Sequence, residues 1–274
     1  MSSGKLQFGD LKIEGCSRAG EGTWFRVRPP GFAFDVGLGA PQLAGAESIF
    51  LTHGHLDHLL GIPFVLSRRS LHRLSHTRVY CPSEIAGGVE GLIRECERLE
   101  EVSYQFELVP LKSGDRVEVA RDLTVEAFSS EHVVPSLGYH LWRQKRSLLP
   151  DLRSLPPGEL AAMRGRGERI DEIRKELWLS YPGDTGPNVF ESNPELYSSR
   201  ILLLECTFLC DSTREAARKY GHTHIEDLAE RQHRFRSEAI VLHHLSRRHR
   251  LEELRESIQQ LLPALASRIH LLSE

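Results

Sequence analysis

The sequence of 274 residues has no apolar run long enough to span a bilayer, and its N-terminus lacks the basic and then apolar layout of a secretory signal. Neither sign of charge dominates, since 35 Lys and Arg residues face 38 Asp and Glu residues and the net charge is -3. These absences disfavour a membrane protein, a secreted protein and a bulk polycation. We therefore expect a cytoplasmic protein that has no membrane partner, and any contact with nucleic acid must come from a local basic patch.

Cysteine is scarce and scattered. The five residues are odd in number and contain no CxxC pair, a pattern typical of a reducing compartment. The last two are four residues apart, but the final one ends an apolar stretch, so we interpret both as core thiols and not as a metal or redox pair. The five are Cys16, Cys81, Cys96, Cys206 and Cys210.

Histidine is abundant, with 14 residues that cluster along the chain. The densest cluster is His53-Gly54-His55-Leu56-Asp57-His58, which directly follows a predicted strand at 48–52 and precedes a predicted helix. Four potential ligands within six residues cannot all point one way on a strand or a helix, whereas a tight loop fans them around a central point. Imidazole and carboxylate groups suit divalent ions such as zinc, so the motif predicts a metal site.

Further potential ligands stand at the ends of three other predicted strands. His132 follows the strand at 123–128, Asp184 follows the apolar run at 177–179, and His244 ends the strand that begins at Ala239. Neighbours on a strand face opposite sides, so only one of His243 and His244 is expected to reach the site.

Apolar runs and helical periodicity alternate in both halves of the chain, which indicates an α/β protein. Mixed strands and helices in each half suggest two sheets packed face to face with helices outside, a four-layer αββα sandwich. The predicted strands are 32–36, 48–52, 78–81, 123–128, 201–205 and 239–243, and the predicted helices are 59–74, 85–101, 213–219, 225–236 and 250–262.

The sequence resembles the metallo-β-lactamase superfamily, and within it the short form of ribonuclease Z, the endonucleases that trim the 3′ ends of tRNA precursors. The likeness runs nearly from end to end. Besides the HxHxDH motif, it rests on Phe34-Asp35-Val36-Gly37, EHVVPSLGY at 131–139, PGDT at 182–185, ECTFL at 205–209, YGHTH at 220–224 and HLSRR at 244–248. Three positions depart from the family pattern, namely Pro182, Leu245 and His249.

The resemblance implies a metallo-β-lactamase fold that forms one domain over residues 1–274, with two metal ions in each chain. One ion would be held by His53, His55 and His132, the other by Asp57, His58 and His244, with Asp184 bridging both; the family pattern selects His244 over His243. Zinc is the expected metal, with manganese or iron as alternatives. Asp35 would orient a ligand histidine or its loop.

The resemblance also implies the chemistry. Asp57 would act as general base, His222 would protonate the leaving ribose oxygen, and Arg248 would steady a phosphate oxygen. The products would be a tRNA with a 3′-hydroxyl and a trailer with a 5′-phosphate. The main alternative is a dinuclear phosphodiesterase for cyclic nucleotides or another small phosphodiester. Thioester hydrolases, flavodiiron reductases and a non-catalytic RNA-binding scaffold fit the sequence less well.

The segment at about 145–176 is rich in charge, proline and glycine and holds little core material, so we expect a solvated excursion. The resemblance implies an inserted arm that grips the precursor tRNA, often across a homodimer. Arginines near two ligand segments predict an RNA-binding patch on both sides of the cleft. They are Arg68, Arg69, Arg73 and Arg78 after the metal loop, and Arg247, Arg248 and Arg250 after His244.

Overall fold

The computed structural model describes residues 3–209 and 213–272. Two seven-stranded sheets lie face to face within these residues, in the orders β1-β2-β3-β4-β5-β6-β7 and β14-β13-β12-β11-β10-β9-β8. The first sheet contains β1 (Gly4–Phe8), β2 (Leu11–Arg18), β3 (Gly22–Arg28), β4 (Phe32–Phe34), β5 (Ser48–Phe50), β6 (Thr77–Pro82) and β7 (Phe106–Leu111). The second contains β8 (Arg116–Ala120), β9 (Leu123–Ser129), β10 (Leu137–Leu148), β11 (Asp171–Tyr181), β12 (Ile201–Glu205), β13 (Ala239–His243) and β14 (Ile269–Leu271).

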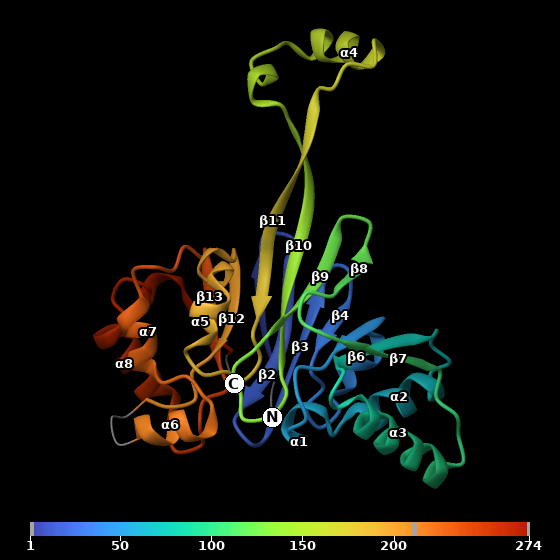
Figure 1. The fold of residues 1–274 in the computed structure, drawn as a ribbon, viewed down its shortest axis with the longest axis vertical. Coiled ribbons are helices and arrows are strands. Elements are labelled where there is room, and N and C mark those ends of the chain that lie inside the picture. Colours follow the sequence, from blue (N-terminus) through green and yellow to red (C-terminus); the bar gives the residue numbers. More distant parts are fainter. Residues whose placement is uncertain (1–2, 210–212, 273–274) are drawn as a thin grey trace.

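Helices cover the outer face of each sheet (Figure 1). The first sheet packs against α1 (Leu56–Leu59), α2 (Ile62–Leu71) and α3 (Ala86–Glu100), and the second against α5 (Val189–Ser192), α6 (Arg214–Tyr220), α7 (Ile225–Arg231) and α8 (Leu251–Leu261). The expected four-layer αββα sandwich is therefore confirmed.

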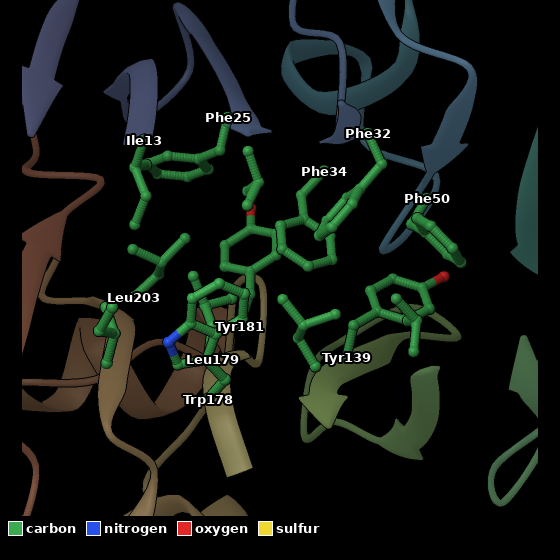
Figure 2. Close-up of a cluster of buried hydrophobic side chains, with 14 of the residues drawn as sticks. Ile13, Phe25, Phe32, Phe34, Phe50, Tyr139, Trp178, Leu179, Tyr181 and Leu203 are labelled. Atoms are coloured by element: carbon green, nitrogen blue, oxygen red, sulfur yellow. The ribbon is translucent and has the colours of Figure 1, made fainter. Parts of the chain in front are cut away.

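Aromatic side chains from both sheets form the core between them, as Figure 2 shows. Phe34 of the first sheet stacks on Tyr139 of the second with ring centroids 5.8 Å apart, and it also contacts Tyr181 at 5.1 Å. Rings of this size remove a large apolar area from water and hold the sheets together. The two tyrosine hydroxyls lie at the edge of this core that faces the histidine loop, since Tyr139 donates a hydrogen bond to the Leu51 carbonyl at 2.6 Å.

The helix predicted at 59–74 is two helices. α1 ends at Leu59 and α2 begins at Ile62, with Gly61 between them. A Cβ atom at Gly61 would lie 1.9 Å from the backbone nitrogen of Gly39, so the chain bends where two backbones touch. The three N-terminal strands β1 to β3 were not predicted, and α7 ends at Arg231, five residues earlier than expected.

The segment 145–176 continues two strands of the second sheet and carries α4 (Pro157–Gly165) at its tip (Figure 1). β9 pairs with β10 only as far as Arg143, and β12 pairs with β11 only at Leu179 and Ser180. Between Gln144 and Leu148 strand β10 therefore pairs with β11 alone, and the hairpin leaves the sheet as an arm. We call residues 144–175 the arm.

No helix in the described part of the chain is both long and apolar enough to cross a membrane. Cys16, Cys81, Cys96 and Cys206 are free thiols, and Cys206 lies in the core beneath α7, as expected. Cys210 lies outside the described residues.

Candidate metal centre

The HxHxDH motif begins in the loop after β5 and continues into α1, which contains Asp57 and His58, and it is anchored on the neighbouring strand end. The backbone nitrogens of Val36 and Gly37 both donate to the His58 carbonyl, at 2.8 and 3.1 Å. The His58 nitrogen in turn donates to the His55 carbonyl at 3.0 Å. These bonds close the turn so that its side chains fan toward one point, as the motif predicts.

Ligands that are distant in the sequence converge on this loop. Three groups of donor atoms lie within 4.8 Å of one another: His53, His55, His132 and Asp184; Asp57, His58 and His244; and Asp184, His222 and His244. Asp184 belongs to the first group and also lies 3.3 Å from both His58 and His244, so it stands between the two groups. All seven predicted metal ligands therefore lie in one cluster.

Four of the histidines are oriented by a hydrogen bond at Nδ1. The partners lie at 2.9 Å for His53 (Thr52 Oγ1), 2.8 Å for His58 (Asp35 Oδ2), 2.9 Å for His132 (Gly221 carbonyl) and 3.0 Å for His244 (Thr207 Oγ1). Such partners on one ring nitrogen leave the other as a metal donor. His55 differs, because its Nδ1 lies 3.2 Å from Nε2 of His132.

The donor set fits divalent cations. Nε2 of His53 is buried and has no hydrogen-bond partner, and the buried Oδ1 of Asp184 has only Nε2 of His58 at 3.3 Å beside it. An orphaned buried polar atom is costly unless something pairs with it, and a cation between these atoms would do so. Burial also lowers the pKa of His53 and His132, which favours the neutral imidazole that binds metal. The cluster is therefore suited to metal ions.

Asp35 is fully buried and joins the metal loop to the core. Its carboxylate accepts hydrogen bonds from the Thr52 nitrogen (2.8 Å) and the Tyr181 hydroxyl (2.7 Å), and it lies 2.8 Å from Nδ1 of His58. Asp35 has a positive φ of 50°, which turns the chain as β4 ends. It therefore orients both a histidine and the loop that carries it.

Glu205 was not singled out from the sequence, yet it organises the other side of the site. This fully buried carboxylate accepts hydrogen bonds from the backbone nitrogens of Thr185, Thr207 and Thr223, at 3.0 to 3.1 Å. It also lies 2.8 Å from Nδ1 of His222. The signal available in the sequence was a charged residue that ends an otherwise apolar strand.

The Glu205 carboxylate controls the charge of His222. Burial alone would lower the pKa of His222, but Glu205 and, less directly, Asp184 raise it to about 9. A raised pKa favours the protonated imidazole, the form that can donate a proton. Its ring stacks on that of His244 with centroids 5.4 Å apart, which places the donor at the edge of the ligand cluster.

Known proteins share both this sequence and this fold. A family model described as a beta-lactamase superfamily domain matches residues 30–245. The tRNase Z TRZ1 of Arabidopsis thaliana is 29% identical over 272 residues, which cover 98% of this chain and 97% of that protein. Ribonuclease Z of Pyrobaculum calidifontis is 31% identical over 241 residues, which cover 84% of this chain and 76% of that protein. The chain belongs to the ribonuclease Z family of the beta-lactamase superfamily.

Among solved structures, human tRNase Z, short form, matches with a TM-score of 0.59 and 20% identity, covering 85% of this chain and 92% of that one. It shows the shared fold. Of the three departures from the ribonuclease Z pattern, Leu245 and His249 are buried beside the site and Pro182 accepts a hydrogen bond from Ser130 through its carbonyl, at 2.7 Å.

Only His244 of the vicinal pair lies in the ligand cluster, as expected, but strand alternation is not the reason. β13 ends at His243, and His244 follows it with a φ of 60°, a left-handed turn that directs its side chain into the cluster. His243 is packed inside the core, 3.2 Å from Ser17 Oγ and in edge contact with Phe25.

The carboxylate of Asp57 is held by the β2–β3 turn and by His244. The backbone nitrogen of Gly20, in the β2–β3 turn, donates to Asp57 Oδ2 at 2.9 Å, and Nε2 of His244 lies 3.6 Å from the same oxygen. Burial opposes ionisation, but His244 and His58 lower the pKa of Asp57 to about 2. Asp57 is therefore a carboxylate at neutral pH.

The predicted arginine patch is only partly present. Arg69 is buried and donates to the Ala44 and Ala46 carbonyls, both at 2.6 Å, so it stabilises a turn and does not face a ligand. Arg78 pairs with Glu107 and stands opposite Ser48, at the start of β5, whereas the metal loop follows its end. Arg248 is exposed, as a phosphate contact requires.

Proposed function

We propose that this chain is a metal-dependent endoribonuclease that removes the 3′ trailer from tRNA precursors and leaves a 3′-hydroxyl on the tRNA. Relatives named tRNase Z and ribonuclease Z match it over most of their length. The observation that carries the proposal is the convergence of seven metal donors, with His222, fixed by Glu205, at their edge.

Two zinc ions in each chain fit the donor set best, with manganese or iron as alternatives. His53, His55 and His132 would hold one ion, and the other donors, Asp57, His58 and His244, would hold the second, with Asp184 shared between them. Bound divalent ions supply charge neutralisation at the phosphate and a water of lowered pKa.

The chain's own residues then move the protons. Asp57, which also belongs to the second donor group, would accept a proton from the attacking water as general base. His222 donates its proton to the ribose oxygen that departs from the phosphorus. The exposed guanidinium of Arg248 steadies a phosphate oxygen. Attack by water leaves the phosphate on the trailer and a hydroxyl on the tRNA.

We also propose a homodimer. β10 runs from the His132 loop to the arm, and β11 returns from the arm to the Asp184 loop, so the arm and the metal donors lie at opposite ends of the same strands (Figure 1). At about 3.3 Å per residue, 12 residues of β10 span roughly 40 Å. An arm directed away from its own site fits a tRNA whose cleaved end lies in the partner's site. The compartment, the cytoplasm, stays a prediction.

The proposal is tested by incubating the zinc-loaded protein with a 3′-extended tRNA precursor and mapping both new ends, with Asp57→Ala as the inactive control. We expect a tRNA with a 3′-hydroxyl and a trailer with a 5′-phosphate. If the protein hydrolyses bis(p-nitrophenyl) phosphate but does not cleave the precursor, the alternative of a phosphodiesterase for small substrates is favoured. A cyclic 2′,3′-phosphate on the product would contradict attack by water.

A further inference from the structure

A cavity of about 170 Å³ lies beside His222, outside the ring of metal donors. Its wall combines the residue before His132, the loop after Asp184 and the facing sides of α6 and α7. The polar groups that face it are Glu131, Asn188, Arg218 and Arg231. Because it adjoins the proton donor, whatever fills it lies next to the leaving oxygen.

One end of the cavity presents a hydrogen-bond acceptor, the carboxylate of Glu131. The Glu131 carboxylate receives one hydrogen bond on each oxygen, at 2.6 Å from Asn188 Nδ2 and at 2.7 Å from the Asn188 nitrogen. Each carboxylate oxygen keeps a further lone pair. A Cβ atom at Gly186 would lie 2.5 Å from Glu131 Oε2, so only glycine lets the carboxylate sit there. The acceptor is therefore held in place before any ligand arrives.

Two arginines line the other end, and each is held by carboxylates. Arg218 is fixed by Asp227, with bonds of 2.5 and 3.1 Å. Arg231 donates to the Asp227 carbonyl at 3.1 Å and to Glu230 at 3.3 Å, and its Nε lies 3.6 Å from Glu191. A guanidinium pair opposite a carboxylate suits a sugar with an attached phosphate, because the phosphate pairs with the cations and a hydroxyl donates to the carboxylate.

We propose that this cavity binds the ribose on the 5′ side of the cleaved bond, and that Glu131 accepts a hydrogen bond from its 2′-hydroxyl. The inference rests on the proposed function, in which His222 protonates O3′ of that ribose. The 2′-hydroxyl is on the neighbouring carbon, and Glu131 and His222 line the same cavity. A volume of this size suits one sugar. Since the 2′-hydroxyl distinguishes RNA from DNA, Glu131 sets the preference for ribose.

The test compares three precursor tRNAs: all ribose, one 2′-deoxyribose on the 5′ side of the cleaved bond, and one 2′-deoxyribose at the first trailer nucleotide. We expect the first deoxy substitution to lower kcat/KM of the wild type roughly 10- to 100-fold more than that of Glu131→Gln, as for a hydrogen bond to a charged group. The intrinsic effect of the hydroxyl on the leaving group is common to all variants. Dividing the loss of kcat/KM in the wild type by the loss in Glu131→Gln therefore isolates the contribution of Glu131. The trailer substitution should affect both proteins equally.

Glu191→Gln is the matched control, because Glu191 is a carboxylate near Arg231 that does not line the cavity. It should respond to the deoxy substrates as the wild type does. A second readout needs neither metal nor turnover. Chelator-treated wild type should bind a tRNA that ends in ribose more tightly than one that ends in 2′-deoxyribose. The difference should be smaller in Glu131→Gln, because its neutral amide oxygen is a weaker acceptor than the carboxylate.

The outcomes separate the two proposals. If no precursor is cleaved, the proposed function fails and the ribose assignment falls with it. If the all-ribose precursor is cleaved but the deoxy penalty is the same in wild type and Glu131→Gln, the function stands and the assignment is overturned. If Glu131→Gln does not fold, Asn188→Ala takes its place. This variant removes one hydrogen bond to the Glu131 carboxylate and should reduce the loss of kcat/KM that the first deoxy substitution causes.

Discussion

Nδ1 of His222 lies 2.8 Å from Oε1 of Glu205, and the same carboxylate binds the backbone on both sides of the site. One buried charge thus fixes the position of His222 and raises its pKa. Replacing it with an amide tests both effects.

In metal-free protein, Glu205→Gln should lower the pKa of His222 below its present value of about 9, because only the weaker effect of Asp184 then opposes burial. The measurement is an NMR titration of the imidazole. Glu226→Gln is the control, since Glu226 pairs with Arg214 at 2.6 Å. An unchanged His222 titration in Glu205→Gln would contradict the role of the carboxylate.

Asp35→Asn should weaken metal binding about 10- to 100-fold, because the amide cannot accept from His58 while also serving Thr52 and Tyr181. Competition with a chromogenic chelator measures the affinity. Tyr181→Phe removes only one of these bonds and should have a smaller effect. Equal affinities in Asp35→Asn and wild type would show that His58 needs no such partner.

His140 should make the protein less stable in mild acid. Burial against Phe128 and Ser180 lowers its pKa to about 3, whereas the unfolded chain titrates near 6.5. Between these values the unfolded chain binds a proton that the folded chain does not, so stability is lost as the pH falls. The loss at pH 5 is about 2 kcal/mol. The free energy of unfolding, measured with urea, should fall between pH 7 and pH 5 by about 2 kcal/mol less in His140→Gln than in the wild type. An equal fall in both proteins would contradict this prediction.

Replacing residues 149–170 with Asn-Gly should close the hairpin at the Leu148–Asp171 pair and leave the body of the protein intact. Metal content and hydrolysis of bis(p-nitrophenyl) phosphate should not change. Binding of precursor tRNA should fall about tenfold or more and depend less on salt, because the arm carries several exposed arginines. Unchanged binding would remove the arm from substrate recognition.

The sequence predicted the ligand cluster and the buried strands β12 and β13 to the residue, because metal donors and continuous apolar runs leave local signals. It missed features set by distant contacts. The break at Gly61 depends on Gly39, the burial of Arg69 depends on carbonyls 23 to 25 residues away, and Glu205 acts through loops from three parts of the chain. No local sequence pattern indicates such long-range contacts.

Strands β10 and β11 carry ligand loops at one end and the arm at the other. Residues added or lost at the far tip leave His132 and Asp184 where they are. Under the proposed function, the tip expected to contact RNA can therefore vary without moving the metal donors, and a different tip could be grafted onto the same body.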